Sequence, residues 1–345
     1  MKFFEDWGVA KLMYFFKLHQ KSTYHYDSVH ALFDAKKIYL FSALAFLVGV
    51  LMTLPIIYVE LQYHIFDAKE VTLSLVFAYV SLFILFVFLE FYLLFLLGFY
   101  LLSYYVYHII DIYKQHNIGT IKEKEFLAML VRTVMELSEP EIVKYNINHK
   151  ERKEKALVLW AFVYKVKVIM TNFILKFIAK KVFTRSSFRL YTPYIASLGT
   201  GLWDGIVYYK TIRHSQYKIM VRLVVLYLWE HKQSLLIGEH YTKLILARYL
   251  DYGEYNNNFD YLLEKIHRET AFNYVINDYI DETHLQSNDK YFILLLYALK
   301  EKRQVKKESL IIHQIDDKEL FKKLLNALKQ GDTPYVYQYI DEKVI

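Results

Sequence analysis

A stretch of 22 consecutive residues without a formal charge, residues 38–59, constrains this chain more than any other feature of its sequence. At about 1.5 Å per residue, a helix of that length reaches roughly 33 Å, enough to cross the hydrocarbon core of a bilayer. Lys36 and Lys37 precede the stretch, and it lacks the polar stripe that a core helix of a soluble protein shows. We therefore predict a transmembrane helix, which Pro55 is expected to kink near its far end.

A second apolar region, residues 71–110, contains a single charged residue, Glu90. Two crossings would need a turn near Glu90, yet residues 87–92 contain no Gly, Pro, Asn, Asp or Ser to form one. The sequence therefore favours one continuous helix, about 60 Å long, whose first half spans the bilayer, over a second hairpin. On that geometry Glu90 lies about 28 Å along the helix, at the cytoplasmic interface, as a structural acid or as a functional carboxylate.

The second half of this long helix, residues 91–110, would extend beyond the bilayer with many aromatic side chains. A bare apolar surface of that size associates in water. It must therefore be covered by another part of the chain, by a second copy or by a partner subunit. The explanation that we favour is that residues 156–229 of the same chain pack on this surface and cover it.

The charges that flank the apolar segments indicate an orientation. Residues 1–37 carry six Lys and four acidic residues, whereas residues 60–70 carry one Lys and three acidic residues. The positive-inside rule then places both termini in the cytoplasm. Residues 1–37 lack a signal-peptide cleavage pattern and are expected to form an amphipathic segment on the cytoplasmic side. Usage rich in Lys, Tyr, Asn and Ile is typical of low-GC bacteria, so we expect a bacterial inner membrane.

Residues 156–229 form a basic apolar module, with eleven Lys and Arg against a single acid and a local net charge of +10. Basic helices with broad apolar faces are typical of membrane-surface elements that bind anionic lipid. Packing against the long helix is a compatible alternative, whereas nucleic-acid binders rarely carry this much Leu, Ile and Phe. The expected lipid-contacting residues are Lys165, Lys176, Lys180, Lys181, Arg185 and Arg189.

Within the module, Ser197, Gly201 and Gly205 recur every four residues. On a helix they form one smooth ridge, which predicts a close contact with another helix. A phosphate-binding loop is excluded because no Gly-Lys-Ser/Thr ending follows Gly201. Asp204 is the single acid of the module. We expect it to pair with Lys210 or Arg213, or to act with Glu90 as a functional acid.

The remaining segments predict soluble helices. The expected fold is all-α: a transmembrane helical hairpin whose second helix is long, joined to a helical cytoplasmic domain. From residue 230 onward, apolar residues recur at helical spacing over residues 233–252, 259–280, 289–300 and 317–329. The expected divisions are residues 1–37, 38–113, 114–155, 156–229 and 230–345.

No motif for catalysis is present in the sequence. The absence of Cys excludes disulfides, thiolate metal sites and cysteine nucleophiles. His spacing does not match a metal site, so neither a metal nor another cofactor is expected. We therefore expect a non-enzymatic inner-membrane scaffold or interaction protein that contacts anionic lipid and a protein partner or a second copy, and not nucleic acid. The alternatives are an oligomeric transporter or channel that uses Glu90 and Asp204, and a lipid-acting membrane enzyme.

Overall fold

The computed structural model describes residues 2–21, 26–62, 73–115, 123–135, 186–231 and 318–345, together with residues 291, 292, 294, 295, 298 and 299. These residues are mostly helical and include no strand, which confirms the all-α expectation for the described part of the chain. The helices are α1 (Lys2–His19), α2 (Val29–Leu32), α3 (Ala35–Gln62), α4 (Leu73–Gln115), α5 (Glu123–Val134), α7 (Ser186–Glu230), α13 (Lys318–Gln330) and α14 (Thr333–Lys343).

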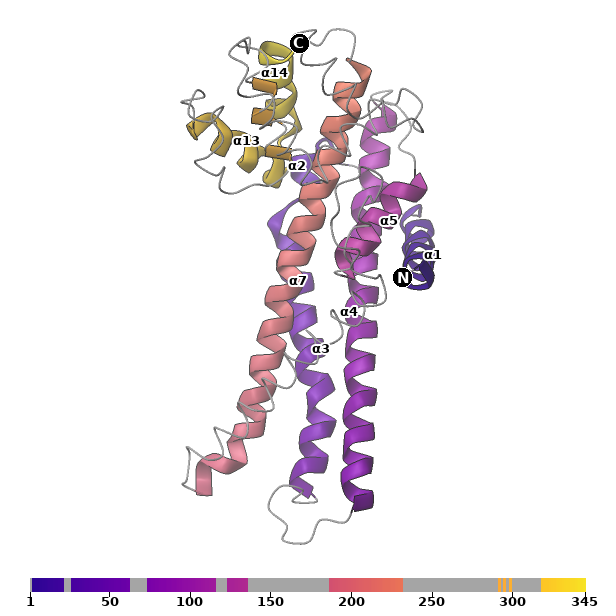
Figure 1. The fold of residues 1–345 in the computed structure, drawn as a ribbon, viewed down its shortest axis with the longest axis vertical. Coiled ribbons are helices and arrows are strands. Elements are labelled where there is room, and N and C mark those ends of the chain that lie inside the picture. The colour runs from indigo at the N-terminus through magenta and orange to yellow at the C-terminus, as the bar shows by residue number, and fades with distance from the viewer. Residues whose placement is uncertain are drawn as a thin grey trace, which may run out of the picture.

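Three long helices, α3, α4 and α7, lie side by side and form the shaft of the molecule (Figure 1). Helix α4 is continuous over 43 residues, so the expected single long helix is present rather than two shorter ones. Helix α3 runs in the opposite direction to α4 and α7. The segments Val29–Val59 and Leu73–Ile112 are long and apolar enough to cross a membrane. By length and composition, the described residues thus contain two candidate membrane spans.

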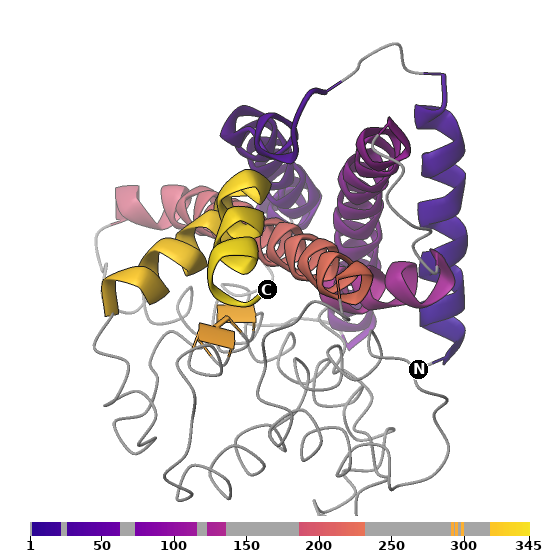
Figure 2. The same ribbon diagram turned by 90° about the horizontal axis from the view of Figure 1, so that it is seen from above.

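The head of the molecule consists of α1, α2, α5, α13 and α14, which lie around the C-terminal halves of α4 and α7 (Figure 1). Helix α1 lies across α4 instead of along it, as the view from above shows (Figure 2). Trp7 of α1 packs on Phe99 with ring centroids 5.9 Å apart, and Phe15 packs on Tyr100 at 5.6 Å. Arg132 of α5 holds the start of α1 through two hydrogen bonds of 2.8 Å to the Glu5 carboxylate.

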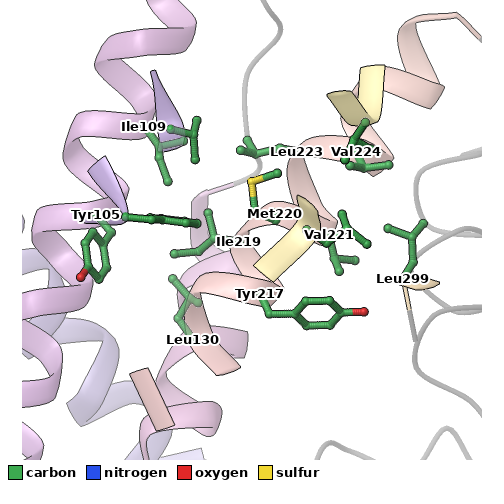
Figure 3. Close-up of a cluster of buried hydrophobic side chains, with 14 of the residues drawn as sticks. Tyr105, Ile109, Leu130, Tyr217, Ile219, Met220, Val221, Leu223, Val224 and Leu299 are labelled. Carbon is green, nitrogen blue, oxygen red and sulfur yellow. The ribbon is translucent and has the colours of Figure 1, made fainter. Parts of the chain in front are cut away.

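The core of the head lies where α4, α5 and α7 meet (Figure 3). Tyr105 and Ile109 of α4, Leu130 of α5 and Ile219 of α7 are all at most 1% exposed. Removing this much apolar surface from water is the main favourable contribution to folding. The second half of α4 is therefore covered within the chain. Helices α1 and α5 share this role with α7, whereas the sequence had indicated only residues 156–229.

The C-terminal helices pack on the upper part of α7 and on α2. Helix α13 confirms the helix expected at residues 317–329. It ends at Gly331, whose positive φ of 76° suits glycine, and Asp332 then caps α14 by accepting a hydrogen bond from the Tyr335 amide. Tyr227 of α7 donates to Asp341 at 2.6 Å. The helices expected at residues 233–252 and 259–280 lie outside the described residues.

Candidate functional site

A belt of exposed apolar side chains surrounds the shaft. On α4 it begins at Leu73, which is 88% exposed, and reaches Tyr92, which is 42% exposed. Those 19 steps correspond to about 29 Å, close to the roughly 30 Å thickness of a hydrocarbon core. Beyond Tyr92 the described side chains of the same helix are half-buried or buried, apart from Tyr100. The belt also includes Tyr39, Leu40, Leu44, Leu47, Leu51, Leu54 and Tyr58 of α3, and Tyr194, Ile195, Leu198, Leu202, Trp203 and Ile206 of α7.

The small-residue ridge of α7 faces α3 along this belt. Ser197 is only 2% exposed, and its Oγ lies 2.5 Å from Thr53 Oγ1 of α3. The same hydroxyl donates to the Val50 carbonyl oxygen at 3.3 Å. Because hydrocarbon offers no hydrogen-bonding partner, a hydroxyl that is satisfied across two helices fixes their relative position.

The two ridge glycines bring the backbones of α3 and α7 together. A Cβ atom added to Gly201 would lie 2.6 Å from the Phe46 carbonyl oxygen and from Val50 Cγ2. At Gly205 it would lie 3.1 Å from the Ser42 carbonyl oxygen. We call this contact, formed by Ser197, Gly201 and Gly205 against α3, the α3–α7 seam.

Asp204 lies beside the seam with its Oδ2 atom buried. This atom occupies the space that a side chain at Gly49 would need, because a Cβ there would collide with it. Gly49 is near the middle of the uncharged residues 38–59. The structure thus packs an acid of α7 against the centre of an uncharged apolar segment.

Glu90 is half-buried on α4. Phe41 of α3 stacks on Tyr100 of α4 with ring centroids 5.9 Å apart, which aligns the two antiparallel helices. Glu90 precedes Tyr100 by ten residues and therefore lies about 15 Å lower on α4. Because α3 runs in the opposite direction, the same distance below Phe41 leads to Leu51, so Glu90 and Leu51 lie at about the same level. Glu90 and Asp204 therefore lie at a similar depth on the two helices that flank α3.

A cation–aromatic cluster at the upper end of α3 was not anticipated from the sequence. Lys37 Nζ donates to Tyr26 Oη at 2.5 Å and to Tyr104 Oη, and it lies 3.7 Å from the centroid of the Tyr104 ring. His108 packs on Tyr104 with ring centroids 4.4 Å apart. Burial, together with the charge of Lys37, lowers the pKa of nearby His19. These side chains come from separate segments, so no local pattern could have indicated the cluster.

Most of the residues that the sequence predicts to contact lipid lie in parts of the chain that the structure does not describe. Lys165, Lys176, Lys180, Lys181 and Arg185 lie outside the described residues. Arg189 belongs to the first turn of α7, at the end of the shaft far from the head, but its side chain is not among those described. Among the side chains that are described, no group of three or more His, Asp and Glu is placed to hold a metal ion.

Comparison with protein families, with curated proteins and with solved structures finds no significant match to this chain.

Proposed function

We propose that the protein is a non-enzymatic scaffold of a bacterial inner membrane, which holds its helical head at the cytoplasmic surface. The belt of exposed apolar side chains carries this proposal. Its height on α4 matches a hydrocarbon core, and above Tyr92 only Tyr100 among the described α4 side chains is exposed. A soluble protein would not leave a continuous apolar surface of this size open to water.

The position of α1 supports a membrane surface at the upper edge of the belt. Helix α1 lies across the upper half of α4 (Figure 1), with ring contacts that reach from Tyr92 to Tyr107. Its exposed side chains include Phe3, Phe4, Tyr14 and Leu18. A helix that lies flat at an interface buries such residues among the lipid headgroups and upper acyl chains. Helices α13 and α14 then project into the cytoplasm, where they offer a surface to a protein partner.

The lower part of α7 is proposed as a further membrane segment, because it packs on α3 within the belt. Because α4 and α7 run in the same direction, both helices would then end on the side of the head (Figure 1). Both termini then remain on one side. The sequence around residue 186 would in that case be exposed on the opposite side from the head.

Single-cysteine labelling tests this proposal directly, because the natural chain contains no Cys. Cysteines are introduced one at a time at Ser187, at Leu85 in the belt, and at Lys322 on α13. In intact cells, a membrane-impermeant maleimide should label only the Ser187 variant, and it should reach the Lys322 variant after permeabilisation. The Leu85 variant should resist the reagent until detergent is added. Equal labelling of all three variants in cell lysate without detergent would refute a membrane location.

A transporter or channel component is the second candidate, favoured by the similar depth of Glu90 and Asp204. Ionisable residues within a bilayer are costly and often mark ion or proton pathways. In liposomes, Glu90→Gln and Asp204→Asn should each abolish a proton or cation flux that the natural protein supports. Glu319→Gln, which removes an exposed acid from α13 in the head, serves as the control. Absence of flux with the natural protein would eliminate this candidate and leave the scaffold proposal intact.

A further inference from the structure

Two exposed apolar stripes within the belt end in a basic residue at their upper edge. On α7 the stripe formed by Leu198, Leu202 and Ile206 continues, four residues later, to Lys210, which is exposed. On α3 the stripe that contains Leu40 begins, four residues earlier, with Lys36, which is also exposed. Residues four apart share a helix face, so each stripe passes directly from hydrocarbon-facing to charged side chains.

Aromatic contacts place these two ends side by side. Tyr39 of α3 and Tyr209 of α7 stack with ring centroids 5.6 Å apart and an interplanar angle of 13°. Lys36 precedes Tyr39 by three residues, and Lys210 directly follows Tyr209. Arg213 Nε donates to Tyr209 Oη at 3.4 Å, with its guanidinium 5.6 Å from the ring centroid. Arg213 thus contacts the tyrosine pair, and the two lysines lie within three residues of it in the sequence. We call Lys36, Tyr39, Tyr209, Lys210 and Arg213 the headgroup cluster.

The chemistry of this cluster matches the polar boundary of a bilayer. Tyrosine is enriched at that boundary, because its ring is apolar and its hydroxyl is polar. Arg and Lys bind phosphate oxygens through charge-assisted hydrogen bonds, and Arg can do so with two parallel donors. No acidic side chain of the described residues forms a salt bridge with Lys36, Lys210 or Arg213.

We propose that the headgroup cluster binds the phosphate of an anionic phospholipid, whose acyl chains lie along the apolar stripes of α3 and α7. The inference rests on the proposed membrane location and names the lipid class that this location would supply. It places the site at the head end of the shaft, at Lys36, Tyr39, Tyr209, Lys210 and Arg213. The sequence had placed lipid contacts at residues 165–189.

The test compares two triple variants with the same change in net charge. The first is Lys36→Gln with Lys210→Gln and Arg213→Gln. The control removes three charges from α13 and α14 by changing Lys322, Lys329 and Lys343 to Gln. Each protein is reconstituted in vesicles of equal phosphatidylglycerol and phosphatidylcholine and then extracted in mild detergent. Native mass spectrometry counts the lipids that remain bound.

The natural protein and the control should retain phosphatidylglycerol in preference to phosphatidylcholine. The cluster variant should lose that preference by about fivefold or more, the factor that corresponds to about 1 kcal/mol for one cation at an anionic surface. Arg213→Lys alone, which keeps the charge but not the paired donors, should lose less. Circular dichroism shows whether the cluster variant keeps its helices.

Two different results would overturn the inference. If the natural protein inserts into the vesicles but retains both lipids equally, or if the cluster variant matches the control, the site is wrong while the scaffold proposal stands. If the natural protein does not insert at all, both fail. Inorganic phosphate, added during extraction, distinguishes the lipid from a free anion: displacement of the lipid by millimolar phosphate would show that the cluster holds phosphate without using the acyl chains.

Discussion

Alanine substitution at Gly201 should loosen the α3–α7 seam, and Gly199 offers a matched control on the same helix. A Cβ atom at Gly201 would lie 2.6 Å from the Phe46 carbonyl oxygen, whereas one at Gly199 would meet no heavy atom within 4 Å. Ordinary contacts of a Cβ atom begin at 3.4 Å. Because the atom that obstructs Gly201 belongs to the backbone, α3 and α7 must move apart by about 1 Å to accept the methyl group.

The expected free energies follow from two opposing effects. Replacing Gly by Ala within a helix stabilises it by about 1 kcal/mol, and this gain is common to both variants. Overpacking at Gly201 costs about 1–3 kcal/mol. Gly199→Ala should therefore be neutral or stabilising, and Gly201→Ala should be about 1–3 kcal/mol less stable than Gly199→Ala. Gly205→Ala should fall between them, because its Cβ would lie 3.1 Å from the Ser42 carbonyl oxygen.

Thermal unfolding in detergent, followed by circular dichroism, measures this series. At about 2–4 °C per kcal/mol for a chain of a few hundred residues, Gly201→Ala should unfold several degrees below Gly199→Ala. Helix propensity cancels in the comparison, so the difference reports the packing alone. A Gly201→Ala protein that unfolds at or above the temperature of Gly199→Ala would show that α3 and α7 do not approach each other as described.

Three further outcomes are expected. Cysteines at Thr53 and Ser197, whose hydroxyl oxygens lie 2.5 Å apart, should form a disulfide under mild oxidation, seen as a mobility shift that reductant reverses; no cross-link would contradict the seam register. Arg132→Gln should lower the free energy of unfolding by about 1–3 kcal/mol, because it leaves the partly buried Glu5 carboxylate without its guanidinium partner. The double variant Glu5→Arg with Arg132→Glu, which exchanges the two charges, should recover part of this loss in thermal unfolding. Because burial lowers the pKa of His19, the unfolded chain binds the proton more readily than the folded one, so stability should fall as the pH drops below 6.5. His19→Gln should flatten this dependence in unfolding temperatures measured between about pH 7.5 and 5. An unchanged slope in the variant would contradict the role of His19.

The long apolar segments were predictable because their signal is local. An uninterrupted run at residues 38–59 and the absence of turn residues near Glu90 are sufficient to predict α3 and a continuous α4. The four-residue spacing of Ser197, Gly201 and Gly205 also identifies one face of a helix, because helical periodicity relates these positions directly. Such features need no knowledge of what lies opposite them.

The partners of these surfaces were not predictable, because they depend on contacts between distant segments. Nothing in the sequence near Asp204 indicates that it packs against Gly49, which lies 155 positions earlier. Similarly, the aromatic residues 91–110 require a cover, but their spacing does not specify that α1 provides part of it. Lys37 also looks like an ordinary flanking charge until Tyr26 and Tyr104 are brought to it.

Helix α7 joins the two parts of the molecule because its packing changes along its length. Its lower part contacts α3 through Gly and Ser, whereas its upper part buries Ile219 and Val224 in the core of the head. The 20 residues from Asp204 to Val224 correspond to about 30 Å of continuous helix. A helix without a break transmits displacement along its axis, so a change that separates α3 from α7 at Gly201 must also shift the surface on which α13 and α14 rest. The Gly201→Ala protein should therefore show faster hydrogen exchange in α13 and α14 than the Gly199→Ala protein, and equal exchange would show that the seam and the head are independent.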